Sequence, residues 1–251
     1  MKEQALKELL YKMADDQFIL GHRNAEWTGL GPILEEDIAF SSMAQDKLGH
    51  SLALYGLLQQ LGEADPDTLA FRRGADQFRC CQLVELPIGE YDFSLVRHFL
   101  FDHAEAVRFA LLSHTAYAPL AQVVAKLQGE LKYHLLHANT MIRRLGNATT
   151  ESISRLQDSL QAAFPYALGM FELSPYEDEL LASGLYAGEA LAQATWLENI
   201  RSVLAQTALS LPDIRQVQPM LGGRLGRHSP FLQPLLDEMT EVVRIDPGAE
   251  W

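Results

Sequence analysis

Apolar residues recur at helical spacing along most of the chain. From about residue 7 to 27 they return every three or four positions, as Leu9, Met13 and Leu20 illustrate. The glycine- and proline-containing stretch 29–32 breaks this run. A second run follows from about 32 to 61, with Gly62 placed to end it. Its length is typical of a helix that spans a whole bundle.

The same spacing predicts five further helices. They cover about 93–117, 119–145, 149–171, 189–209 and 230–243. Asp92 is placed to cap the first of these, Thr149 or Thr150 the third, and Asp65 a short helix between the runs. The break at Ala118-Pro119 is so short that the helices on either side must be antiparallel.

No stretch alternates apolar and polar residues as a strand would. The predicted fold is therefore all-α. We expect a single domain over 1–251, with a four-helix bundle core at about 5–146 and additional C-terminal helices at about 149–243.

Two helices carry histidines in related surroundings. In four-helix carboxylate bundles, a Glu-x-x-His motif on each of two helices supplies half of the ligands of a two-metal centre. Here Lys47 lies three residues before His50, and Leu131 lies three residues before His134. Both motifs lack their glutamate. The pattern indicates a metalloprotein or a relative of one that has given up its metal.

Pairing the helices as antiparallel hairpins brings acids toward these histidines. Lys47 and His50 fall opposite about 13–17, while Glu130 and His134 fall opposite about 102–105. Asp46/His50 and Glu130/His134 are each four residues apart and so share a helix face. His98, His103 and His114 are expected to be surface or structural histidines. The predicted central cluster is Asp16, Asp46, Lys47, His50, Asp102, Glu105, Glu130 and His134.

Lys47 separates two hypotheses. An ammonium cannot bind a metal ion, but a lysine among inward carboxylates forms buried ion pairs that replace the cation. We therefore predict a vestigial metal site, with no catalytic residue, metal or cofactor in this chain. The candidate partners of Lys47 are Asp16, Asp102, Glu105 and Glu130. If Lys47 instead points outward, an incomplete mononuclear site remains open, built from His50, Glu130 and His134.

Composition narrows the function classes. The 251 residues carry a net charge of −13, which argues against a nucleic-acid partner because phosphate binding needs clustered Lys and Arg. No run of 18 apolar residues indicates a membrane segment. The two cysteines, Cys80 and Cys81, are adjacent, and nothing pairs with them at zinc-site spacing. We expect reduced thiols in a cytoplasmic protein.

A set of short stretches, taken in order, resembles a known family. They lie at 25–27, 34–37, 46–49, 91–93, 97–102, 130–135, 223–230, 236–239 and 247–251. The strongest is Gly223–Pro230. Together they resemble the non-catalytic, ferritin-like subunit (PaaC type) of bacterial phenylacetyl-CoA ring epoxidases. His50 is a departure, because a metal-free subunit need not keep such a residue.

The resemblance implies a multicomponent di-iron monooxygenase. A homologous catalytic subunit would hold the iron and bind phenylacetyl-CoA, and a reductase component would supply electrons from NADPH. Oxygen would enter the ring as an epoxide in aerobic phenylacetate catabolism. This chain would pair with the catalytic subunit and support it. Candidate interface residues are Phe231, Leu232 and Trp251, with core packing favoured for Phe231.

Two other hypotheses remain. The chain could be a ferritin-like metalloprotein or oxygenase with its own iron or manganese, held by Asp46, His50, Glu130 and His134. It could also be a free-standing helical homodimer with no link to an oxygenase.

Overall fold

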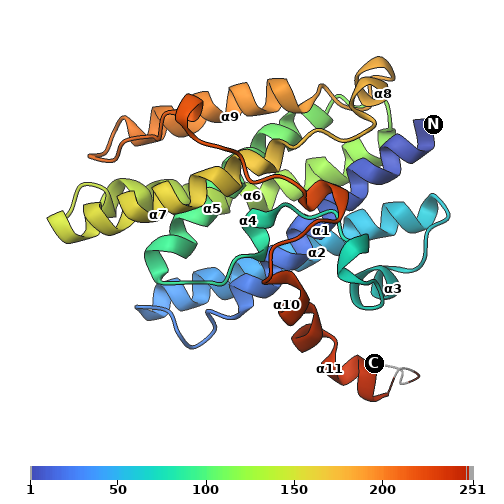
Figure 1. Cartoon of the computed structure of the whole chain (residues 1–251), viewed down its shortest axis with the longest axis horizontal. Helices are drawn as coiled ribbons and strands as arrows, with labels where there is room; N and C mark the ends of the chain where they lie inside the picture. Colours follow the sequence, from blue (N-terminus) through green and yellow to red (C-terminus); the bar gives the residue numbers. More distant parts are fainter. Residues whose placement is uncertain (1, 247, 249–251) are drawn as a thin grey trace.

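The first two long helices form an antiparallel hairpin. The computed structural model describes residues 2–246 and 248. Helices α1 (Lys2–Ala25) and α2 (Leu34–Gln60) pack along their length (Figure 1). Gly62 follows α2 with a positive φ of 87°, a conformation that glycine adopts without strain. Gly62 therefore ends α2 as the sequence predicts.

The second hairpin completes the bundle core. Helices α5 (Tyr91–Leu112) and α6 (Ala118–Leu145) pack together, and α6 also packs on α2. Between the hairpins lie α3 (Pro66–Phe71), a 3-10 turn (Ala75–Gln77) and α4 (Gln82–Glu85). Asp65 caps α3, since its carboxylate accepts a 3.0 Å hydrogen bond from the Thr68 amide. The prediction of an all-α fold with a bundle core is confirmed.

Further helices cover α5. Helices α7 (Thr150–Leu168) and α9 (Glu189–Leu204) both pack on it, and α8 (Glu177–Ala182) lies between them in the chain. Three 3-10 turns occur at Gly169–Phe171, Ile214–Gln216 and Gly223–Leu225. The last helices, α10 (Leu232–Met239) and α11 (Glu241–Ile245), lead away from the bundle (Figure 1).

Two local predictions were wrong. Asp92 does not cap α5, which begins one residue earlier; its carboxylate instead accepts a 2.7 Å hydrogen bond from Arg155. The single helix expected at 230–243 is divided at Thr240. The Thr240 hydroxyl donates to the Leu236 carbonyl at 2.6 Å, a local bond that competes with regular helix geometry.

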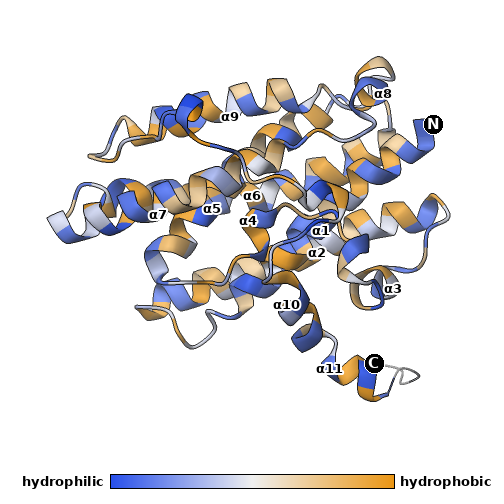
Figure 2. Ribbon diagram, in the orientation of Figure 1, coloured by the Kyte–Doolittle hydropathy of each residue, from blue (hydrophilic) through white to orange (hydrophobic). Residues whose placement is uncertain are grey.

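The main apolar core runs from α1 to α10. Apolar and polar residues alternate along the long helices, as expected for helices with one buried face (Figure 2). Because α6, α7 and α9 all pack on α5, its polar residues Arg97, His98, Asp102, Glu105 and Arg108 are also buried. Buried charges need partners, and these partners define the centre of the molecule.

The surface differs from the sequence prediction at the C-terminal end. Leu232 is fully buried against the core, so it cannot serve as an interface residue, while Phe231 is 40% exposed. Trp251 lies outside the described residues. Across the part of the chain that the structure describes, no helix has the length and apolar character needed to cross a membrane. The single-domain expectation stays a prediction.

Candidate metal centre

Lys47 points into the bundle and pairs with Asp102. Its Nζ lies 2.7 Å from Asp102 Oδ1, and neither side chain is exposed to solvent. The ammonium also lies 4.8 Å from the centre of the Phe101 ring. The hypothesis of an outward lysine is therefore wrong. Of the four acids considered from the sequence, Asp102 on α5 is the partner.

The second carboxylate oxygen of Asp102 contacts a histidine. His98 Nδ1 lies 3.1 Å from Asp102 Oδ2, one turn earlier on α5. Burial by itself would raise the pKa of Asp102, but the charges of Lys47 and His98 outweigh it and hold that pKa well below its usual range. Asp102 is therefore an ionised carboxylate that already has a cation beside it.

His50 and His134 face each other across α2 and α6. Their ring centres are 6.2 Å apart and nearly parallel. His50 Nε2 lies 2.7 Å from Glu130 Oε2, and His134 Nε2 lies 2.9 Å from Asp46 Oδ2. The Nδ1 atom of each ring is buried and has no hydrogen-bond partner. The four residues thus form two crossed pairs between the helices.

These histidines are neutral. Burial, followed by the positive charge of Lys47, lowers the pKa of His50 and that of His134 to about 4. Each ring therefore donates its Nε2 proton to a carboxylate and keeps a lone pair on Nδ1. A ring held in this way by an outer carboxylate is oriented as metal-bound histidines are.

The rest of the donor set does not fit a two-metal centre. Lys47 and the buried apolar Leu131 occupy the positions where Glu-x-x-His motifs carry glutamates. Within residues 2–246, one group of three ligand-type side chains has all donor atoms within 4.8 Å of one another, and it lies elsewhere. The centre retains two oriented imidazoles, but an ammonium neutralises its inward carboxylate.

Two predicted members lie in a neighbouring network. Glu105 forms an ion pair with Arg108 and accepts a 2.8 Å hydrogen bond from Gln17. Arg108 also reaches Glu189, with Nη2 at 3.4 Å from Oε2. Gln17, rather than Asp16, is the α1 residue that faces Glu105. Its amide left no signal in the sequence, because a lone glutamine in a helix is usually a surface residue.

Asp16 lies outside the Lys47 group. Its two carboxylate oxygens bind the Arg224 guanidinium at 2.8 and 2.7 Å, and one of them also accepts from the Cys81 amide at 2.8 Å. Arg224 comes from the C-terminal part of the chain, which no helix pairing of the first 146 residues predicts. Asp16 therefore holds the C-terminal segment against α1.

Sequence reasoning missed His98 as a member of the centre. It was expected to be a surface or structural histidine, but it is fully buried against Asp102. The four-residue spacing between His98 and Asp102 on one helix was the available signal. His137 makes a similar contact outside the centre, with Nε2 at 2.8 Å from Glu36 Oε2.

The two cysteines are buried and free. The expectation that nothing pairs with them fails for Cys80. Its Sγ lies 3.8 Å from Glu85 Oε1 and 3.9 Å from His228 Nδ1. Because His228 is 148 residues away in the chain, no local spacing motif could reveal this group.

Comparison with known proteins agrees with the all-helical bundle. The family model of the phenylacetic acid catabolic proteins, which covers the PaaA and PaaC types, matches residues 1–251. The chain belongs to this family. It is 29% identical over 241 residues to the PaaC-type subunit of the 1,2-phenylacetyl-CoA epoxidase of Escherichia coli (strain K12), with 96% of each chain covered. The family resemblance inferred from the sequence is confirmed.

Proposed function

We propose that this chain is the structural, non-catalytic subunit of a multicomponent di-iron monooxygenase. In this proposal the complex epoxidises the ring of phenylacetyl-CoA in aerobic phenylacetate catabolism. A homologous catalytic subunit holds the iron, and a reductase component delivers electrons from NADPH. Family membership and the similarity to a subunit of the Escherichia coli epoxidase support this assignment.

One observation carries the non-catalytic part of the proposal: the Lys47 ammonium pairs with Asp102 in the middle of the bundle. A divalent cation beside Lys47 would meet a positive charge with no water between them, where electrostatic repulsion is strongest. It would also find the Asp102 carboxylate already neutralised. The chain therefore contributes its folded surface to the complex, and the partner contributes the oxygen chemistry.

A surface suited to such a partner lies at the start of α2. Leu30, Ile33, Leu34 and Ile38 are 62%, 53%, 69% and 60% exposed. Stable subunit interfaces are large and apolar, whereas scattered single apolar residues need no partner. We assign this stretch to contact with the catalytic subunit. The double variant Leu34→Glu/Ile38→Glu should abolish co-purification, while Leu173→Glu, which changes a leucine of 58% exposure elsewhere, should not.

Turnover tests the role directly. The catalytic partner is assayed for epoxidation of phenylacetyl-CoA with its reductase, NADPH and oxygen, alone and after co-expression with this chain. We expect activity to depend on this chain and to be unaffected by His50→Ala, since no step is assigned to that residue. Undiminished epoxidation by the partner without this chain would refute the proposal.

A second candidate is a metalloprotein with its own iron or manganese. The unpartnered Nδ1 atoms of His50 and His134 favour it, because their rings are oriented as ligands are. Metal analysis of protein from iron-supplemented cells separates the two candidates. Near-stoichiometric iron that is lost in His134→Ala but kept in His103→Ala would establish the second. Sub-stoichiometric iron that is unchanged in both variants supports the structural role.

A further inference from the structure

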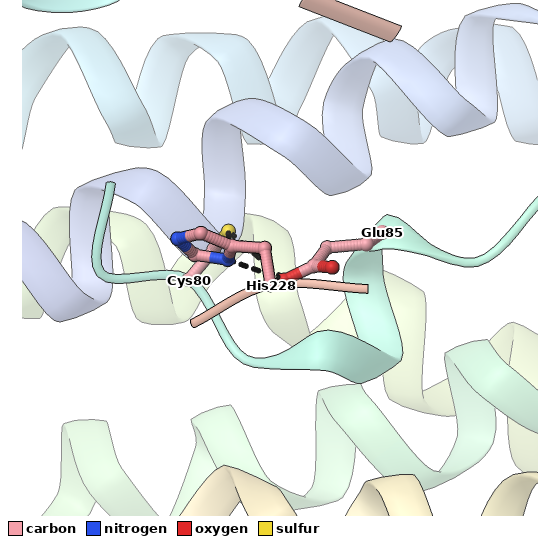
Figure 3. Close-up of side chains that lie close together, drawn as sticks. All are labelled: Cys80, Glu85 and His228. Carbon is pink, nitrogen blue, oxygen red and sulfur yellow. Dashed lines mark hydrogen bonds and ion pairs between the residues drawn. The ribbon is translucent and has the colours of Figure 1, made fainter. Parts of the chain in front are cut away.

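Three side chains with metal-binding atoms meet at a second place in the molecule. Cys80, Glu85 and His228 point toward one another (Figure 3). Cys80 Sγ lies 3.8 Å from Glu85 Oε1 and 3.9 Å from His228 Nδ1, and His228 Nδ1 lies 2.7 Å from Glu85 Oε1. Cys80 and Glu85 are fully buried, and the His228 side chain is only 6% exposed.

The surrounding backbone fixes the orientation of two of these side chains. His228 Nε2 lies 3.2 Å from the Phe78 carbonyl, so that nitrogen carries a proton and Nδ1 faces the group. The other Glu85 oxygen accepts a 2.7 Å hydrogen bond from the Ser229 amide. Outer contacts of this kind orient histidine and carboxylate ligands in metal sites.

We propose that Cys80, Glu85 and His228 bind a zinc ion. Thiolate sulfur and imidazole nitrogen favour Zn²⁺ over Mg²⁺ or Ca²⁺, which prefer oxygen ligands. Cys80 would bind as a thiolate after giving up its proton to solvent. The charges of that thiolate and of the Glu85 carboxylate then balance the two charges of the ion. A water molecule completes the tetrahedral set.

The spacing of the donor atoms is close to what zinc requires. Zinc bonds of about 2.0–2.3 Å in tetrahedral geometry place neighbouring donors roughly 3.4–3.6 Å apart. The two distances from Cys80 Sγ, 3.8 and 3.9 Å, are slightly longer than this. The 2.7 Å distance between His228 and Glu85 is shorter, because a hydrogen bond joins these atoms without metal. Binding therefore requires the imidazole and carboxylate to separate by less than about 1 Å.

The ion would join two segments that are far apart in sequence. Glu85 and His228 are 143 residues apart, and other contacts already bring these segments together. Gln82 Nε2 donates to the Arg227 carbonyl at 3.1 Å, and Arg224 binds Asp16. A metal at this point would strengthen the attachment of the C-terminal segment to α4, because the free energy of metal binding adds to the stability of the fold. The role is structural and independent of the Lys47 centre.

Cobalt titration of the metal-free, full-length chain tests this site. Co²⁺ replaces Zn²⁺ in tetrahedral sites, and a thiolate ligand gives an intense charge-transfer band in the near ultraviolet. We expect this band at one equivalent of Co²⁺ and its disappearance when Zn²⁺ is added. Cys80→Ser should abolish the band and weaken zinc binding by at least about tenfold. His134→Ala should leave the band unchanged, which separates this site from the candidate metal centre.

Cys81→Ser is the matched control, since Cys81 is equally buried and adjacent but lies outside the group. It should retain the band, and zinc should raise its melting temperature as it does for the unaltered chain. Circular dichroism checks that Cys80→Ser is folded, and His228→Gln provides a second variant that should weaken binding. The proposal is wrong if the unaltered chain gives no band, or if Cys80→Ser binds zinc as tightly as Cys81→Ser does.

Discussion

Replacing Lys47 by methionine should destabilise the protein strongly. Methionine keeps most of the volume and apolar length of lysine but removes the ammonium that pairs with Asp102 at 2.7 Å. The Asp102 carboxylate would then be buried with only His98 as a neighbour. Removing one member of a fully buried ion pair typically costs about 3–5 kcal/mol. We expect a loss of that size in the free energy of unfolding at pH 7.5.

The double variant Lys47→Met/Asp102→Leu should recover much of this loss. Replacing both members of a buried pair by apolar residues is often close to neutral. Here His98 would lose its acceptor, which costs about 1–3 kcal/mol. The double variant should therefore be less destabilised than Lys47→Met alone. The coupling energy between the two positions should be clearly non-zero, as expected for residues in direct contact.

Urea unfolding followed by circular dichroism measures these differences through the midpoint and the slope. Lys132→Met is the matched control, because Lys132 is exposed on α6 and should tolerate the change. A lower pH should reduce the loss in Lys47→Met, since protonation removes the unpaired charge of Asp102. The reasoning would be refuted if Lys47→Met matched Lys132→Met in stability, or if the two single effects simply added in the double variant.

Three further predictions follow from the same contacts. Lys47→Glu restores a Glu-x-x-His motif on α2 and should increase iron bound per chain, an increase that His50→Ala should remove; unchanged iron content would argue against a vestigial site. The pKa of His50 and that of His134 are lowered to about 4, so the stability they contribute is present above pH 6.5 and lost as pH falls from 6.5 to 4; a urea midpoint that stays flat over this window would contradict the buried, neutral rings. Arg224→Met leaves Asp16 buried without its cation and should cost about 3–5 kcal/mol, with faster proteolysis of the C-terminal segment; a cleavage rate like that of the unaltered chain would count against this role.

The sequence alone was sufficient for the fold class and for the histidines of the centre. Apolar spacing is a local signal, and it located both helical hairpins because a helix buries residues three and four positions apart. The spacing of Lys47 and His50 also showed that a glutamate was missing from its motif. These conclusions depend only on residues within a few helical turns of one another.

Only the tertiary structure decided which side chains meet. Successive residues of a helix point about 100° apart, so Asp16 and Gln17 face different neighbours, although both lie near the expected height. Asp16 meets Arg224, which is 208 residues away, and Lys47 meets Asp102 on another helix. Such pairs depend on how helices are rotated and packed, and local periodicity carries no information about this. The physical reason is that burial selects long-range partners for charges, whereas sequence spacing records only the face on which each charge lies.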